Sequence, residues 1–145
     1  MWPNLFTGRE RRRYIRLPLE IEVNFKINGE NGEGPWHSGR TRDISLEGIC
    51  LVTDLFPKEK WEEIAQNKKH LHISLDFPGE KEKITAEAEV HRIEVEAQIV
   101  WRRHKKKEEK DICLLGLKFI RIEKDTQEII RRYIADNLMS RYRSV

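Results

Sequence analysis

The sequence predicts a mainly β protein: a small six-stranded antiparallel β-barrel with one short helix and a C-terminal amphipathic α-helix. Three observations carry this prediction. Several stretches alternate between apolar and polar residues, turn-forming residues separate them, and apolar residues recur at helical spacing near the C-terminus. Short strands with short connections favour antiparallel pairing and closure into a barrel. The 145 residues suffice for one domain with an ordinary core.

The first strand is expected over residues 17–27, where six apolar side chains fall on one face and polar side chains on the other. A turn rich in glycine and asparagine ends it over residues 28–35. The same reasoning predicts further strands over residues 36–44, 49–53 and 71–77, and a short helix over residues 57–67.

Residues 84–103 form a longer apolar stretch with an irregular period. Its apolar residues occupy even positions up to Val90 and odd positions from Ile93 onward. Such a change of phase moves the apolar side chains from one face of the strand to the other. Because no turn residue marks a hairpin there, we expect a β-bulge near His91 and Arg92.

The end of the chain combines a charged segment, a strand and a helix. Residues 102–110 are almost entirely charged and are expected to form a solvated hairpin loop before a final strand over residues 112–122. The helix is expected to begin with a capping box in which Asp125 is the N-cap. Its apolar face would then lie on the barrel or on a partner.

The bulk composition excludes several classes of protein. Lys and Arg total 28 against 25 Asp and Glu, a mixed charge that does not indicate a polymeric nucleic acid as partner. The two cysteines lie in apolar runs and are expected to be buried, and the five histidines lack the spacing of a metal site. Without a secretory leader or an apolar stretch of membrane-spanning length, the expected compartment is the cytoplasm.

Two short segments carry the chemistry. Residues 9–16 hold five arginines in eight positions, at the end of a flexible N-terminal tail (residues 1–16) that precedes the domain (residues 17–145). The second segment, Asp43-Ile44-Ser45-Leu46-Glu47-Gly48, follows a predicted strand. Guanidiniums bind phosphate and guanine edges as bidentate forks, and a carboxylate accepts from guanine N–H groups. The pair of segments therefore indicates a pocket for a phosphorylated guanine nucleotide.

Both segments match signatures of a known family. Arg12-Arg13-Tyr14-Ile15-Arg16 resembles the RxxxR signature of PilZ domains, and Asp43 to Gly48 resembles their (D/N)xSxxG signature. Ile99-Val100-Trp101 and Leu115-Gly116-Leu117-Lys118-Phe119 resemble the strands that close such a barrel. The resemblance extends from Arg9 to the end of the chain and includes no second domain.

The resemblance implies binding of the bacterial second messenger cyclic di-GMP. Arg12 and Arg16 would clamp phosphate or guanine, Asp43 would accept from a guanine edge, and Trp101 would offer an aromatic surface. Arg11 occupies a position that goes with two stacked ligands, so an intercalated dimer of cyclic di-GMP is expected. The complete expected site is Arg11, Arg12, Arg13, Arg16, Asp43, Ser45, Gly48 and Trp101.

The expected function is that of an effector or adaptor without a cofactor. The tail would fold over the nucleotide and signal to an unidentified protein partner. Catalysis is not expected, because no catalytic triad, paired carboxylates or phosphate-cradling glycine loop stands out. Two alternatives remain: a protein-interaction barrel that needs no ligand, and, less favoured, a non-specific nucleic-acid binder that uses residues 9–16 and 102–107.

Overall fold

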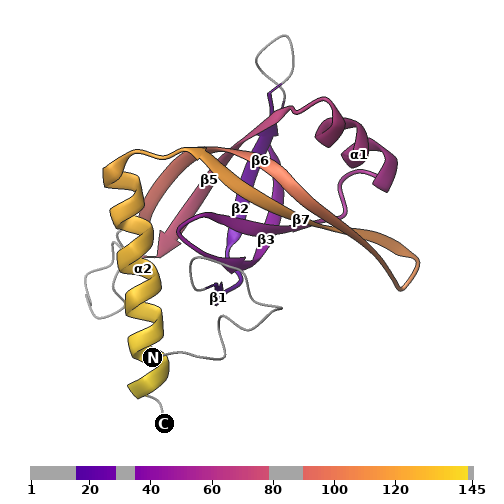
Figure 1. Cartoon of the computed structure of the whole chain (residues 1–145). Helices are drawn as coiled ribbons and strands as arrows, with labels where there is room; N and C mark the ends of the chain where they lie inside the picture. The colour runs from indigo at the N-terminus through magenta and orange to yellow at the C-terminus, as the bar shows by residue number, and fades with distance from the viewer. Residues whose placement is uncertain (1–15, 29–34, 79–89, 144–145) are drawn as a thin grey trace, which may run out of the picture.

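The chain folds into a closed antiparallel barrel with two helices (Figure 1). The computed structural model describes residues 16–28, 35–78 and 90–143. The strands are β1 (Leu17–Pro18), β2 (Glu22–Ile27), β3 (His37–Ile44), β4 (Gly48–Thr53), β5 (His70–Pro78), β6 (Val90–Lys107) and β7 (Lys110–Arg121). The helices are α1 (Lys58–Gln66) and α2 (Lys124–Arg143).

The sheet order is β1-β3-β2-β5-β6-β7-β4, and β4 also pairs with β3. That last pairing closes six strands into the barrel and leaves β1 outside it, attached to β3. The predicted fold class, a six-stranded antiparallel barrel with a short and a terminal helix, is therefore confirmed. None of the described helices is both long and apolar enough to cross a membrane.

Alternating strand residues fill the barrel, and the helices cover it on opposite sides (Figure 1). From α1, Trp61 and Ile64 are fully buried in this core. From α2, Ile130 is buried, and the Tyr133 ring packs on Phe77 with 4.4 Å between ring centroids. The helical period predicted for α2 thus directs its apolar face onto the barrel.

The strand predicted over residues 17–27 is in fact two strands. Both β1 and β2 pair with β3, and the chain between them leaves the regular ladder. The Thr41 hydroxyl fills the gap, because it accepts from the Ile21 N–H at 3.0 Å and donates to the Leu19 carbonyl. The Thr41 side chain on the neighbouring strand therefore replaces backbone hydrogen bonds between the strands. The alternation of apolar residues in the sequence could not reveal this replacement.

The β-bulge predicted near His91 and Arg92 is wrong for the described pairing. β6 pairs with β5 without a shift from Pro78↔Val90 to His70↔Gln98. The irregularities lie on the other side of β6, against β7, between Glu96 and Ala97 and between Ile99 and Trp101. Residues 84–89, where the even-numbered phase begins, lie outside the described residues.

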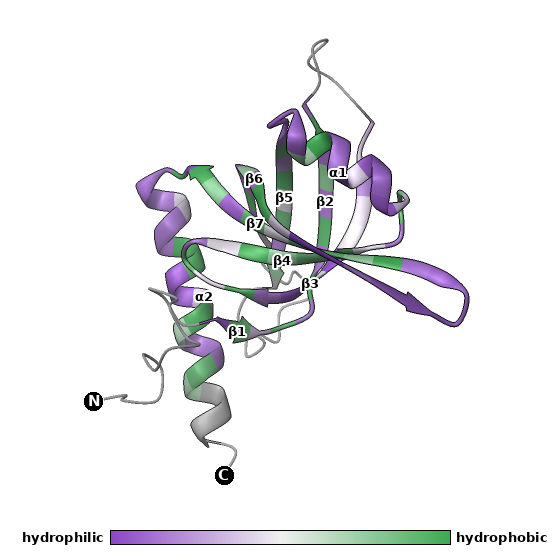
Figure 2. Cartoon of the chain, turned by 45° about the vertical axis from the view of Figure 1, so that its right-hand side comes forward, coloured by the Kyte–Doolittle hydropathy of each residue, from purple (hydrophilic) through white to green (hydrophobic). Residues whose placement is uncertain are grey.

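The charged segment predicted as a loop is a β-ribbon. β6 and β7 continue past the barrel to a turn at Glu108 and Glu109, both in the left-handed region with φ of 51° and 65°. We call residues 102–111 the arm; Figures 1 and 2 show it projecting from the barrel. Because both faces of a projecting ribbon meet water, it needs no apolar alternation and its composition resembles that of a loop.

The terminal helix begins earlier than the capping box predicted. α2 already includes Lys124, and the Gln127 N–H donates to the Glu123 carbonyl at 2.9 Å. Asp125 therefore lies inside the first turn instead of at the N-cap. Its negative charge there remains favourable, because the N-terminus of a helix carries a partial positive charge.

Candidate functional site

The short strand β1 places an arginine of the first signature beside the aspartate of the second. Leu17 pairs with Ile44 across β1 and β3, and both side chains are buried in the core. Since neighbouring residues of a strand point to opposite faces, Arg16 and Asp43 lie on the outside of the barrel. Arg16 Nη1 lies 3.6 Å from Asp43 Oδ1.

The Asp43 carboxylate is held between two guanidiniums. Arg42 Nε lies 4.0 Å from Asp43 Oδ2, opposite the Arg16 contact. Both distances exceed the ~2.7–2.9 Å of a charge-assisted hydrogen bond, so the carboxylate retains acceptor capacity. The Asp43 side chain is 13% exposed and that of Arg16 is 26% exposed. The carboxylate is therefore accessible to a ligand yet already in a positive surrounding.

A row of register partners connects Asp43 to Trp101 across four strands. Asp43 pairs with Cys50 of β4, Cys50 with Gly116 of β7, and Gly116 with Trp101 of β6. Directly opposed residues point to the same face of a sheet. Three steps between strands span about 14 Å along the sheet. Asp43 and Trp101 therefore stand at the two ends of one strip on the outer face.

Cys50 forms the floor of this strip. Its neighbours Ile49 and Leu51 belong to the core, so the thiol points outward, and yet Cys50 is completely buried. Burial, followed by the charge of Asp43, raises the pKa of the Cys50 thiol to about 11, against opposing effects of arginines. Those arginines are Arg42, Arg16 and Arg103. The floor is therefore a neutral thiol at neutral pH.

Arg103 is a site residue that the sequence analysis did not select. It lies two positions after Trp101 on β6 and pairs with Leu114, so it shares the outward face of Trp101. Its charge acts on the Cys50 thiol together with that of Arg16. The alternation of Trp101 and Arg103 could have indicated this position, but the surrounding basic run concealed it.

The indole of Trp101 lies against the backbone of Gly116. A Cβ atom at Gly116 would collide with the Trp101 ring atoms, so the absence of a side chain there makes room for the indole. Trp101 itself is half-buried. Gly116, which appeared only as part of a closing strand in the sequence, therefore fixes how the aromatic surface is presented.

We expect Gly116→Ala to impair ligand binding more than folding. The added methyl group would push the Trp101 ring aside, and a half-buried side chain can move at a cost of about 1 kcal/mol in stability. Loss of the stacking surface should lower nucleotide affinity about tenfold, the lower range of base–aromatic stacking energies. Calorimetric titration and urea denaturation of the same variant measure the two effects. Unchanged affinity would show that Trp101 does not contact the ligand.

Ser45 and Gly48 shape the turn between β3 and β4. The Ser45 hydroxyl oxygen accepts from the N–H groups of Glu47 at 3.1 Å and Gly48 at 3.2 Å, and the hydroxyl donates to the Gly48 carbonyl at 3.3 Å. Ser45 is 4% exposed. A Cβ atom at Gly48 would collide with the backbone carbonyl of Leu117 on β7. Both residues thus have structural roles, and their contact with a ligand stays a prediction.

The structure brings part of the expected site together. Arg16 adjoins Asp43, and Trp101 lies in the same strip, while Ser45 and Gly48 form the turn that follows Asp43. Arg11, Arg12 and Arg13 lie outside the described residues. In the described part of the chain, no group of three or more His, Cys, Asp or Glu side chains could hold a metal ion.

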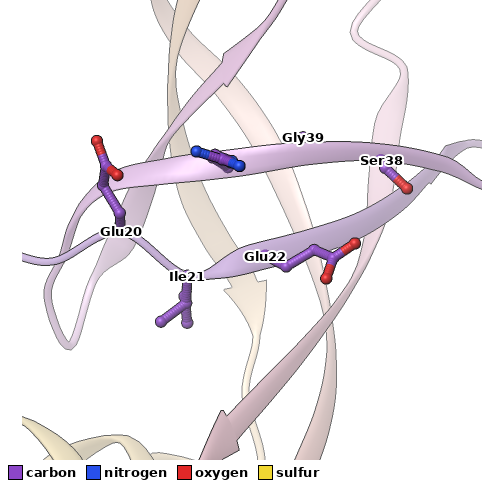
Figure 3. A pocket seen from close by; sticks show the side chains of 6 residues that line it. Glu20, Ile21, Glu22, Ser38 and Gly39 are labelled. Carbon is purple, nitrogen blue, oxygen red and sulfur yellow. The ribbon is translucent and has the colours of Figure 1, made fainter.

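A separate hollow of about 500 Å³ lies over β2 and β3 (Figure 3). Its lining includes Glu20, Glu22, Ser38 and Arg40. Glu22 comes from β2, Ser38 and Arg40 come from β3, and Glu20 lies in the segment just before β2, where Figure 3 labels it. Two carboxylates against one guanidinium would repel a phosphodiester, so this hollow does not suit an anionic nucleotide.

Comparison with known proteins identifies the same architecture. A family model described as PilZ domain matches residues 10–136. The PilZ domain with c-di-GMP of YcgR from Escherichia coli matches at 15% identity and a TM-score of 0.58, covering 92% of this chain and 97% of that one. No curated protein matches the sequence.

Two longer proteins share the fold. The Bacillus subtilis inhibitor of motility (MotI/DgrA) matches at 22% identity and a TM-score of 0.61, over 88% of this chain and 51% of its own. The K. pneumonia MrkH–c-di-GMP complex matches at 17% identity and a TM-score of 0.63, over 93% and 55%. This chain thus spans about half the length of each. Because the family match covers nearly all of the chain that forms the barrel, the chain belongs to the PilZ domain family.

Proposed function

We propose that this protein is a cyclic di-GMP effector that binds the nucleotide on the strip between Asp43 and Trp101. The observation that carries the proposal is the 3.6 Å contact between Arg16 and Asp43, which joins the two signature segments at one point. The cyclic di-GMP complexes of the YcgR PilZ domain and of MrkH support the choice of ligand.

Each proposed contact has a chemical reason. Asp43 accepts hydrogen bonds from the N–H groups of a guanine edge, which only an acceptor can satisfy. Arg16 leaves its loose contact with Asp43 and binds phosphate or the O6 and N7 atoms of guanine as a fork. Trp101 stacks on a base at the other end of the strip. A lysine in place of Arg16 could not form the same fork.

The arginines before residue 16 complete the proposed site. β1 holds Arg16 beside Asp43, and the segment carrying Arg11, Arg12 and Arg13 precedes Arg16 by three to five positions in the sequence. We propose that this segment becomes ordered over the nucleotide and that a partner protein recognises the reshaped surface. The ligand binds as an intercalated pair and is not converted, so the output is a change of surface and not a product.

Titration with cyclic di-GMP, GTP and cyclic di-AMP in a calorimeter tests the proposal. Saturable binding of cyclic di-GMP alone, at two molecules per chain, is the expected result. Hydrogen exchange of the amides in residues 9–16 should slow when the ligand is present. No heat at micromolar protein would favour the ligand-independent interaction barrel, and fast amides in a saturated complex would disprove the ordering step alone.

A further inference from the structure

The arm carries a concentrated positive charge, of which the candidate nucleotide site accounts for Arg103 alone. It is a two-stranded ribbon that projects from the barrel, and most of its residues have the purple of hydrophilic residues in Figure 2. Its β6 strand consists of basic residues alone: Arg102, Arg103, His104, Lys105, Lys106 and Lys107. All six are exposed. Because the two strands of the ribbon are paired, the basic side chains follow the alternation of a strand.

The ribbon sorts these residues onto two faces. Side chains alternate along a strand, so Arg103, Lys105 and Lys107 share one face, and Lys110 joins them as the register partner of Lys107. We call these four residues the outer face, because Trp101 begins the same side. The opposite, inner face consists of Arg102, His104 and Lys106, whose register partners are Leu115, Cys113 and Asp111.

The two faces differ in how their charge is compensated. On the inner face, His104 Nε2 lies 3.2 Å from Asp111 Oδ1, and Asp111 is also the register partner of Lys106. The base of the arm borders a cavity of about 120 Å³ against α1, whose lining includes Arg102 and Arg103 together with Glu62 and its ion-pair partner Lys58. On the outer face, the register partners of Arg103, Lys105 and Lys107 are Leu114, Ile112 and Lys110, and none of these three described residues is acidic.

The outer face is also unfavourable for folding. Lys107 and Lys110 stand directly opposite each other next to the turn, and like charges in that relation destabilise a hairpin. The turn adds to the cost, because Glu108 and Glu109 adopt a left-handed conformation that non-glycine residues rarely adopt. An anionic partner would relieve this repulsion between like charges.

We propose that the outer face of the arm is a docking surface for duplex DNA, which it contacts through phosphates without reading sequence. A two-stranded ribbon fits the major groove, and lysine suits phosphate as a point charge. Protein interfaces are instead depleted in lysine, which supplies three of the four charges. The mixed overall charge of the chain argued against a polymeric nucleic acid, but that total does not show that six basic residues follow one another on a single strand.

A membrane surface is the less suitable partner for the arm. Elements that lie on a bilayer insert large apolar side chains beside their basic residues. The exposed large apolar residues in the described part of the chain are Trp36, Leu55, Val100, Ile120 and Met139, all outside the arm. The arm therefore has the positive charge that phosphate binding requires, but it lacks the exposed apolar side chains that would anchor it in a membrane.

Fluorescence anisotropy tests this proposal. It measures the affinity of the full chain, free of cyclic di-GMP, for a labelled 24-base-pair DNA duplex of arbitrary sequence. Lys105→Ala with Lys107→Ala removes two outer charges, and Arg102→Ala with Lys106→Ala removes two inner charges as the matched control. The outer variant should reduce the slope of log affinity against log salt by about two units, at roughly 0.9 per phosphate contact. The inner variant should keep most of the slope.

Several results would overturn the assignment. Equal losses in both variants would show that only the net charge matters. Binding to vesicles of anionic phosphatidylglycerol but not to the duplex would assign the arm to a membrane, and preference for polyglutamate would assign it to an acidic protein. Melting curves confirm that both variants fold, and because cyclic di-GMP is absent, failure of the proposed nucleotide function would not affect the outcome.

Discussion

Asp43→Ala is expected to lower the affinity for cyclic di-GMP about 30-fold. The substitution would leave guanine N–H groups without an acceptor in the bound state, which costs about 2 kcal/mol. Asp43 is suited to this role because it is only 13% exposed and its contacts to Arg16 and Arg42 are long. Arg16→Ala should cost a similar amount through loss of the fork. Calorimetric titration of each variant measures these losses.

The chain provides a matched control for this prediction. Asp76 and Arg92 form another aspartate–arginine pair on the barrel, at 2.8 Å and partly exposed. Asp76→Ala removes the same charge from strands β5 and β6, outside the strip, and should leave nucleotide affinity unchanged. If Asp43→Ala instead strengthened binding, the nucleotide would be held by non-specific attraction to positive charge, and the pocket would be wrong.

Gly48→Ala is expected to destabilise the barrel by about 3 kcal/mol, the upper range for overpacking. The new methyl group would meet the carbonyl oxygen of Leu117 at the seam between β4 and β7. This obstacle is backbone on a paired strand, so neither partner can move without breaking the ladder between β4 and β7. Urea denaturation followed by tryptophan fluorescence measures the free energy of unfolding.

Gly39→Ala is the control for the glycine substitution. There the nearest atom to an added methyl group is the Leu51 Cδ1 atom, at 2.8 Å, the end of a side chain that can adjust its rotamer. We expect a loss of about 1 kcal/mol at this position. Equal losses at the two glycines would show that Gly48 has no special relation to β7.

Apolar period and turn composition predicted the barrel, but they could not predict contacts between distant strands. The break after β1 depends on the Thr41 hydroxyl, which lies 20 positions from Ile21 in sequence. The predicted burial of Cys50 is confirmed, but the sequence could not show that its side chain is buried on the outside of the barrel, near charged groups. A sequence shows that a residue is apolar and not which side of the sheet buries it.

The candidate site was predictable where its chemistry lies in short motifs. The two signatures, present in the expected order, predicted that Arg16 and Asp43 lie in one site. In the structure, Arg16 Nη1 and Asp43 Oδ1 are 3.6 Å apart. The supporting glycine and the additional arginine carry no motif of their own. Gly116 matters because an indole from another strand lies on it, and Arg103 because its strand continues as a ribbon.

The attachment of β1 has a mechanical consequence. Two backbone-paired residues connect everything before residue 16 to the strand that carries Asp43. A restraint on residues 1–15 would therefore act on the strand that carries Asp43. In the proposed function, linkage makes this relation reciprocal: a partner that restrains residues 1–15 in their nucleotide-bound arrangement would raise the affinity for the nucleotide, and the nucleotide would raise the affinity for that partner by the same factor.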